Sequence, residues 1–165
     1  RDSIYFASHN HKIIAVDQSS AAVDVMRLNI QDNRNYDLHV VTQDFLKYDF
    51  SSHDPIDVFY SRFTLHAINK HEEDILLPRI HNHLRAGGLF CVEARTTKDP
   101  LYGVGKDCGD NAFRTDHYRR FIDPTIFLKT MLSLGCDLLF FIEENDLSVY
   151  NDDNPVLLRA IFQKR

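Results

Sequence analysis

The segment that most constrains the fold is IIAVDQSSAAVDVMRLN, residues 13–29, where a short apolar run ends in an acid and leads directly into helical spacing. The apolar residues before Asp17 are typical of a buried strand, which we predict at Lys12–Asp17. A helix is predicted at Ser19–Asn29. The residues expected on the inner side of this helix are Ala22, Val25, Met26 and Leu28. A strand that leads straight into a helix is the repeating unit of an α/β fold.

The same alternation of strand and helix patterns continues along the chain. Further strands are predicted at Leu38–Thr42, Ile56–Ser61 and Leu89–Glu93. Further helices are predicted within Asn69–Leu84 and from Pro124 to a stop at Gly135. The last two apolar runs, Leu138–Ile142 and Val156–Phe162, have only a polar loop between them, so they should pair antiparallel. The predicted fold class is therefore α/β, a doubly wound mixed sheet with a C-terminal antiparallel strand pair.

The helix between Asn69 and Leu84 carries its own start and stop signals. Asn69 and Glu72 stand three residues apart, which is the spacing of a capping box. Pro78 lies inside the pattern and predicts either a kink or a later start of the helix. The glycine pair of RAGG is expected to end the helix before the next strand.

Composition limits the class of protein. With 165 residues, 44% of them hydrophobic, residues 1–165 are long enough for a single compact domain with an apolar core. No apolar run approaches the about 20 residues needed to cross a bilayer, and nothing resembles a signal peptide, so we expect a soluble cytoplasmic protein with no membrane partner. The three cysteines show no CxxC spacing, and no metal site is predicted. A formal net charge of -5 disfavours nucleic acid as a partner.

Polar residues follow the carboxyl ends of the predicted strands. They are Asp17, Asp44, Ser61, Arg62, Glu93 and Arg95. Ligands of such sheets bind in the crevice beyond these ends. Asp17 can accept both vicinal hydroxyls of a ribose, because the two carboxylate oxygens match their spacing. The alternative is that Asp17 only caps the helix that follows it.

With these motifs in place, the chain resembles the class I S-adenosylmethionine-dependent methyltransferases over nearly its whole length. The matching segments are IIAVDQS, VVTQDFLKYDF, IDVFYSRFTLHAI and LRAGGLFCVEA, followed by the closing strand pair. The resemblance implies a Rossmann-like fold and S-adenosylmethionine as the cofactor. It places Asp17 and Gln18 in the ribose motif. It also implies that Asp44 binds the exocyclic amine of the adenine and that the backbone N–H of Phe45 donates to the adenine ring. Residues near the methionine end would be Ser61 and Arg62.

One part of the family pattern is missing. The first strand and its glycine-rich loop are absent, and the opening RDSIYFA is similar to the residues after that loop, with the first helix beginning at Asp2 or Ser3. In the family the missing strand lies between the strands that end at Asp17 and Ser61. A gap at this position would leave backbone N–H and C=O groups without partners. Each buried group of this kind lowers the free energy of unfolding by about 1–3 kcal/mol. From the strand order of the family we therefore expect about 30 or more further residues before Arg1.

The stretch at 96–121 is inserted between the fourth predicted strand and the Pro124 helix. It holds half of the glycines, and connections this long are usually functional or disordered, but its aromatic residues argue against disorder. In the family, insertions at this place build the acceptor pocket and lid. Candidate substrate-binding residues are Arg95, Tyr102, Arg119 and Arg120, which with His117 would suit an anionic small molecule. The alternative is solvated surface charge balanced by Asp99, Asp107, Asp110 and Asp116.

His66 and His117 are the candidates for a catalytic base, because an imidazole titrates near neutral pH and a hydroxyl acceptor must lose a proton. For His66, a packed and hydrogen-bonded histidine is an equally good interpretation. We favour O-methylation of a small anionic acceptor. The segments DPLYGxG and HYRRF resemble small bacterial methyltransferases, including those of capsule and surface-polysaccharide biosynthesis.

Two other functions stay open at this point. A nicotinamide-dependent oxidoreductase would also place an acid like Asp17 after its second strand, but it would predict neither Asp44 nor a closing antiparallel pair. A non-catalytic, methyltransferase-like binding module is the second alternative, because the glycine loop is missing. The oligomeric state and the acceptor are not determined by any of these patterns.

Overall fold

The computed structural model of the protein describes residues 1–30 and 35–165. The chain divides into two compact units, Arg1–Phe50 and Ser51–Arg165. The prediction of one methyltransferase-like domain across residues 1–165 stays a prediction.

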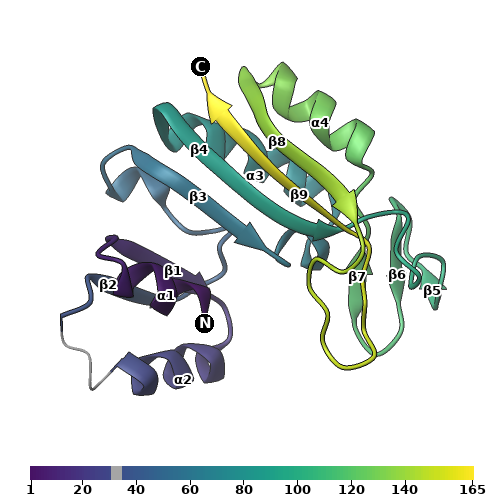
Figure 1. Cartoon of the computed structure of the whole chain (residues 1–165), viewed down its shortest axis with the longest axis horizontal. Coiled ribbons are helices and arrows are strands. Elements are labelled where there is room, and N and C mark those ends of the chain that lie inside the picture. Colours follow the sequence, from purple (N-terminus) through teal and green to yellow (C-terminus); the bar gives the residue numbers. More distant parts are fainter. Residues whose placement is uncertain (31–34) are drawn as a thin grey trace. The chain divides into compact units, whose positions relative to one another are not determined.

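The first unit contains two parallel strands and two helices (Figure 1). Its elements are α1 (Asp2–Ser8), β1 (Ile13–Asp17), α2 (Ser20–Ile30) and β2 (Leu38–Thr42). The register of the strand pair runs from Ile13 opposite Leu38 to Asp17 opposite Thr42. The first helix begins at Asp2, which is one of the two starts, Asp2 or Ser3, that the resemblance implies.

The buried face of α2 differs from the prediction. Val23 is fully buried, whereas Val25 and Leu28 are 57% and 62% exposed. Apolar residues surround most of this helix, so spacing alone did not identify the inner side.

The second unit is built on a four-stranded mixed sheet. Its main elements are β3 (Ile56–Arg62), α3 (Lys70–His83), β4 (Leu84–Arg95), α4 (Pro124–Ser133), β8 (Cys136–Glu144) and β9 (Leu157–Lys164), with 3-10 turns η1 (Phe50–Ser52) and η2 (Leu65–Ala67). The strand order is β3-β4-β9-β8, in which β3 and β4 are parallel and β9 is antiparallel to both of its neighbours. The closing antiparallel pair and the mixed α/β class are therefore confirmed.

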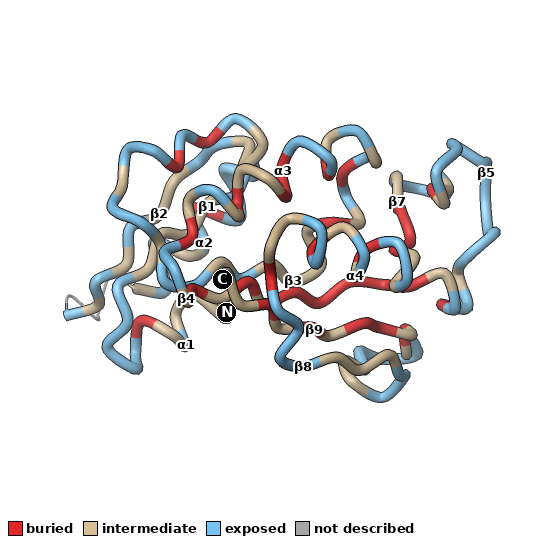
Figure 2. The backbone as a smooth tube through the Cα atoms, turned by 90° about the horizontal axis from the view of Figure 1, so that it is seen from above, coloured by how far each residue is buried: buried red, intermediate tan, exposed pale blue. Residues whose placement is uncertain are grey.

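The core of this unit lies along the two central strands. Figure 2 shows buried residues concentrated on β4 and β9, while β5 is exposed. Phe90 and Phe162, which are opposite each other in the sheet, are fully buried. The ring of Phe127 on α4 meets that of Phe162 edge-on at 5.8 Å, which fastens the helix to the sheet.

Each of the two units pairs its strands within itself. Within residues 1–30 and 35–165, β1 pairs only with β2, and β3 pairs only with β4. No described strand is hydrogen-bonded to both β1 and β3.

The capping box of α3 is confirmed. Asn69 accepts from the backbone N–H of Glu72 at 2.9 Å, and the Glu72 carboxylate accepts from the N–H of Asn69 at 2.8 Å. Because the helix starts at Lys70, Pro78 lies inside it, and the predicted later start is wrong.

The predicted end of α3 at the glycine pair is also wrong. The helix ends at His83, and β4 already begins at Leu84. Lys164 donates to the carbonyls of His81 and Leu84 at 2.8 and 2.9 Å, which satisfies acceptors at this junction. Gly87 has a φ of 72° where the pairing of β3 with β4 shifts register, so the glycines allow a bulge within the strand.

The insertion at 96–121 contains a small sheet that the sequence did not predict. Three short strands, β5 (Lys106–Asp107), β6 (Ala112–Arg114) and β7 (Tyr118–Arg120), pair antiparallel in that order. The ends of the insertion are joined, since Ile122 donates to the carbonyl of Arg95 at 2.9 Å and Thr97 donates to that of Ile122 at 3.1 Å.

A buried ion pair attaches this insertion to α3. The guanidinium of Arg120 contacts the Glu73 carboxylate and donates through Nε to the carbonyl of Ile68 at 3.0 Å. Both charged side chains are 4% exposed. Lys70 lies 3.6 Å from the other oxygen of Glu73.

Arg120→Ala should lower the free energy of unfolding by about 3–5 kcal/mol, because it leaves a buried carboxylate without its main partner. We expect the lower end of this range, since Lys70 remains beside Glu73. Urea denaturation measures the change. Arg114→Ala on β6, where the side chain is exposed, is the control and should stay within about 0.5 kcal/mol of the parent. A loss below about 1 kcal/mol for Arg120→Ala would contradict a structural role for this pair.

Candidate cofactor and acceptor site

Asp17 stands at the carboxyl end of β1 with one oxygen engaged. Its Oδ1 accepts from the N–H of Ser19 at 2.8 Å, and Oδ2 has no partner among the described residues. Ser19 itself caps α2, because its hydroxyl accepts from the N–H of Ala22 at 3.2 Å. Asp17 therefore supports the turn without serving as the N-cap. Gln18, also predicted at the cofactor, is exposed.

Asp44 and Phe45 form a tight turn at the same edge of the first unit's sheet. The N–H of Gln43 donates to the carbonyl of Asp17 at 3.0 Å, so the segment after β2 runs beside the end of β1. The turn is closed by the N–H of Lys47, which donates to the carbonyl of Asp44 at 2.9 Å. The N–H of Phe45 makes no backbone hydrogen bond within the described residues.

Ser61 and Arg62 end β3 at the carboxyl edge of the second unit's sheet. The hydroxyl oxygen of Ser61 is buried and has no hydrogen-bond partner in the described part of the chain. Arg62 donates through Nε to Glu93 at 2.8 Å and through Nη2 to the hydroxyl of Ser148 at 2.9 Å. Its charge is thus balanced by a neighbouring strand.

Glu93 lies beside Ser61 and Arg62 at the ends of the strands. The sequence indicated only that it lies at the end of a strand, and assigned it no role. Glu93 is buried and accepts from both Arg62 on β3 and Arg159 on β9. Arg159 also donates to the carbonyl of Leu147 at 2.5 Å. No pattern within the sequence pairs Arg159 with Glu93, because their meeting depends on the antiparallel register of β9.

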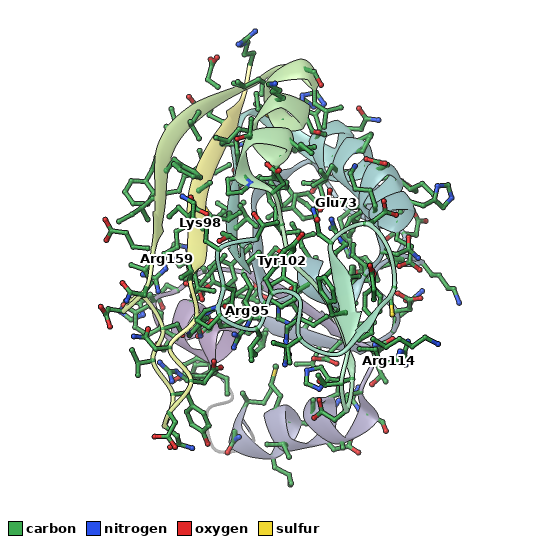
Figure 3. The ribbon with its side chains drawn as sticks, turned by 90° about the vertical axis from the view of Figure 1, so that its right-hand side faces the viewer. Glu73, Arg95, Lys98, Tyr102, Arg114 and Arg159 are labelled. Atoms are coloured by element: carbon green, nitrogen blue, oxygen red, sulfur yellow. The ribbon has the colours of Figure 1, made fainter. Side chains whose placement is uncertain are left out.

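Two of the predicted substrate-binding arginines are neutralised inside the second unit. Arg95, labelled in Figure 3, pairs with Asp99 at 3.0 Å and with Asp153. Arg120 pairs with Glu73. A negatively charged acceptor would have to displace a carboxylate to bind either guanidinium, so direct roles for Arg95 and Arg120 stay predictions that this geometry does not favour.

The insertion encloses a pocket of about 230 Å³. Its lining residues are Leu101, Val104, Phe113, Thr115, Asp116, His117, Arg119 and Phe121. Predicted residues His117 and Arg119 therefore share one pocket. Tyr102, which is labelled in Figure 3, does not line this pocket, but its ring lies 5.2 Å from that of Phe113, which does.

Asp116, His117 and Arg119 form a chain of hydrogen bonds along the pocket. Arg119 can only donate, so the 2.5 Å contact from its Nη2 makes Nε2 of His117 the acceptor. The proton of the neutral ring then lies on Nδ1, which is 2.8 Å from the Asp116 carboxylate. Hydrogen bonds from the Thr115 hydroxyl and from His117 lower the pKa of Asp116 to about 2. Asp116 is therefore charged at neutral pH and holds His117 in one tautomer.

A family model described as a methyltransferase domain matches residues 1–88. This is more than half of the 165 residues. The chain belongs to this methyltransferase-domain family. A search of curated proteins found no significant match.

Solved structures share the fold of this methyltransferase domain. An S-adenosylmethionine-dependent methyltransferase from Methanosarcina mazei is 13% identical with a TM-score of 0.81, covering 98% of this chain and 86% of that chain. A putative one from Listeria monocytogenes is 16% identical with a TM-score of 0.74, covering 99% and 85%. The 1,6-didemethyltoxoflavin-N1-methyltransferase of Burkholderia thailandensis, with bound 1,6-didemethyltoxoflavin and S-adenosylhomocysteine, is 15% identical with a TM-score of 0.71, covering 99% and 66%. Identities this low show the fold alone, and they confirm the predicted Rossmann-like architecture.

The methyltransferase domain has donors and acceptors that suit the predicted cofactor. S-adenosylmethionine carries ribose hydroxyls, an adenine ring and an amino-acid end. The free oxygen of Asp17, the unpaired N–H of Phe45 and the orphaned hydroxyl of Ser61 are the kinds of group that such a ligand satisfies.

His66 lies on η2, just past β3, and is held neutral. Burial, followed by the positive charges of Arg119 and Arg95 and by His117, lowers its pKa from 6.5 to about 4. Its Nδ1 is buried without a partner among the described residues, so the predicted alternative of a hydrogen-bonded packed histidine is not met at this atom.

In the described part of the chain, no helix is long and apolar enough to cross a membrane. The same residues contain no group of three or more His, Cys, Asp or Glu side chains that could hold a metal ion.

The low pKa of His66 makes the methyltransferase domain sensitive to acid. Below pH 6.5 the unfolded chain protonates this ring, whereas the folded chain resists until about pH 4, so protons favour unfolding over this range. The free energy of unfolding should fall by up to about 3 kcal/mol from this group as the pH drops from 6.5 to 4.

Chemical denaturation across this pH range measures the effect. His66→Gln should flatten the slope relative to the parent, while His71→Gln at an exposed position of α3 should leave it unchanged. Equal slopes for the parent and His66→Gln would show that His66 is not protected in the folded state.

Proposed function

We propose that this methyltransferase domain transfers a methyl group from S-adenosylmethionine to a small acceptor with an anionic group, with oxygen as the favoured methylated atom. The observation that carries the proposal is the pocket in the insertion, where His117 is oriented by Asp116 beside Arg119. Such a base next to a cation suits a hydroxyl acceptor that carries negative charge.

The cofactor residues are assigned by the free groups at the strand ends. Asp17 binds the ribose hydroxyls through the oxygen that Ser19 leaves open, and Asp44 and Phe45 bind the adenine. Ser61 contacts the methionine end through its orphaned hydroxyl. S-adenosylmethionine agrees with the family and with the S-adenosylhomocysteine bound to the Burkholderia protein. This cofactor supplies an activated methyl group on a sulfonium.

His117 acts on the acceptor. Its Nε2 takes the proton of the acceptor hydroxyl, while Asp116 holds Nδ1–H and stabilises the imidazolium that forms. Arg119 orients the negative group of the acceptor. His66 is the weaker candidate for the base, because a group with a pKa of about 4 holds a proton poorly at neutral pH.

A small molecule is the proposed acceptor class. The Burkholderia methyltransferase acts on 1,6-didemethyltoxoflavin, which is a precedent for a small acceptor on this fold. A role in capsule or surface-polysaccharide modification rests on the resemblance of DPLYGxG and HYRRF alone, and it stays a prediction. The cytoplasmic location is likewise a prediction.

The alternatives differ in their standing. The antiparallel closing pair and the methyltransferase family both disfavour the nicotinamide-dependent oxidoreductase. The non-catalytic module keeps the same fold and is separated from the enzyme only by its ligands and its activity.

Asp17→Ala should weaken the binding of S-adenosylhomocysteine by about 10- to 100-fold, because the charged acceptor for the ribose hydroxyls is lost. Isothermal titration calorimetry on the full chain measures this change. Asp37→Ala, an exposed carboxylate before the other end of β2, is the matched control and should bind like the parent.

Absence of S-adenosylhomocysteine binding by the folded parent would overturn the proposed function and favour the non-catalytic module. Binding that Asp17→Ala leaves unchanged would overturn the assignment of Asp17 alone.

A further inference from the structure

The charge available to an acceptor is smaller than the sequence implies. Arg95 forms ion pairs with two carboxylates, and Arg120 forms an ion pair with one. Arg119 differs from both, because it forms no ion pair with a carboxylate of the described residues. With Asp116 charged nearby, the pocket offers one free cation and no surplus of positive charge. Such a site matches a single negative charge and would repel a diphosphate.

The rest of the pocket wall is apolar. Leu101, Val104, Phe113 and Phe121 contribute most of the non-polar lining. Phe121 is 1% exposed, and its ring lies 6.2 Å from that of Phe113. Tyr102 packs edge-on against both rings, at 5.2 and 5.7 Å, so the wall is supported from behind. A flat apolar ligand would find one fixed aromatic surface here, that of Phe113, with Phe121 buried against it.

The size of the pocket suits a small ligand group. Its volume is about 230 Å³. An apolar cavity of about 150 Å³ holds a benzene ring. The pocket in the insertion therefore has room for one ring and its substituents, whereas a sugar linked to a nucleotide is far larger.

We propose that this pocket takes a planar aromatic acid with one negative charge and a ring hydroxyl, rather than a phosphorylated or nucleotide-linked sugar. The ring packs against Phe113, which Phe121 supports, and the carboxylate pairs with Arg119. This inference rests on the proposed function, because it names the acceptor class of the same site.

The same geometry couples binding of the aromatic acid to the availability of Nε2 of His117 as a base. In the structure, the lone pair on Nε2 of His117 is occupied by the N–H of Arg119 at 2.5 Å. When a carboxylate pairs with Arg119, the guanidinium turns to it and Nε2 becomes available to a neighbouring hydroxyl. The proton of that hydroxyl then passes to Nε2, and Asp116 balances the new positive charge.

Three probes test the acceptor class on the full chain by ligand-observed NMR titration. They are 2-hydroxybenzoate, phenol and UDP-glucose. We expect 2-hydroxybenzoate to bind most tightly and phenol to bind about 10-fold more weakly or worse, because phenol lacks the charged group. UDP-glucose should show no binding that 2-hydroxybenzoate displaces.

Arg119→Met removes the charge but keeps the length of the side chain. The substitution should weaken the binding of 2-hydroxybenzoate by about 10-fold or more, and it should change the affinity for phenol by less than about 2-fold. Arg114→Met is the matched control, because Arg114 is exposed on the same small sheet and does not line the pocket (Figure 3). It should leave all three probes unchanged.

The inference is overturned if 2-hydroxybenzoate does not bind, if UDP-glucose binds more tightly, or if Arg119→Met and Arg114→Met behave alike. An S-adenosylhomocysteine titration of the same samples separates this failure from failure of the proposed function. Cofactor binding that depends on Asp17, without binding of the aromatic acid, overturns the acceptor class alone. If the folded parent protein does not bind S-adenosylhomocysteine, the proposed methyltransferase function itself is overturned.

Discussion

A single buried carboxylate joins the carboxyl ends of β3 and β4 to the amino end of β9 in the second unit. Glu93, at the end of β4, accepts from Arg62 on β3 and from Arg159 on β9. Burying a carboxylate is tolerable only while such partners stay hydrogen-bonded to it. The same arginines reach the Ser148 hydroxyl and the carbonyl of Leu147, so the loop between β8 and β9 is tied to the strand ends. The arrangement of these strand ends therefore depends on this cluster.

The acceptor region follows the same physical logic. Arg95 is held by Asp99 and Asp153, and Arg120 is held by Glu73. These buried pairs fasten the insertion and its neighbours to the main sheet, because removing one partner would leave an uncompensated charge. Positive charge that looks like a ligand site in the sequence thus serves the structure. Arg119, which lines the pocket of the insertion, forms no ion pair with a carboxylate of the described residues.

Much of the fold follows from local signals. The strand at Leu38–Thr42, the capping box at Asn69 and the closing antiparallel pair were all predictable, because periodicity, caps and loop length are written within a few residues. The buried face of α2 was not predictable, since apolar residues surround the helix and tertiary packing selects Val23. The short strands of the insertion were missed because strands of two or three residues carry almost no periodic signal.

By itself the sequence determined the order of strands and helices, the acid after the first strand and the candidate residues at the strand ends, since each of these depends on neighbours along the chain. Only the tertiary structure decided which charged groups are neutralised and which line a pocket. Arg120 and Glu73 are 47 positions apart, and Arg159 and Glu93 are 66 apart. No local pattern encodes such pairs, because their energy arises only when the register of the strands and the packing of the helices bring the charges together. Arg120 and Glu73 meet where both are buried, and Arg159 meets the buried Glu93 while partly exposed.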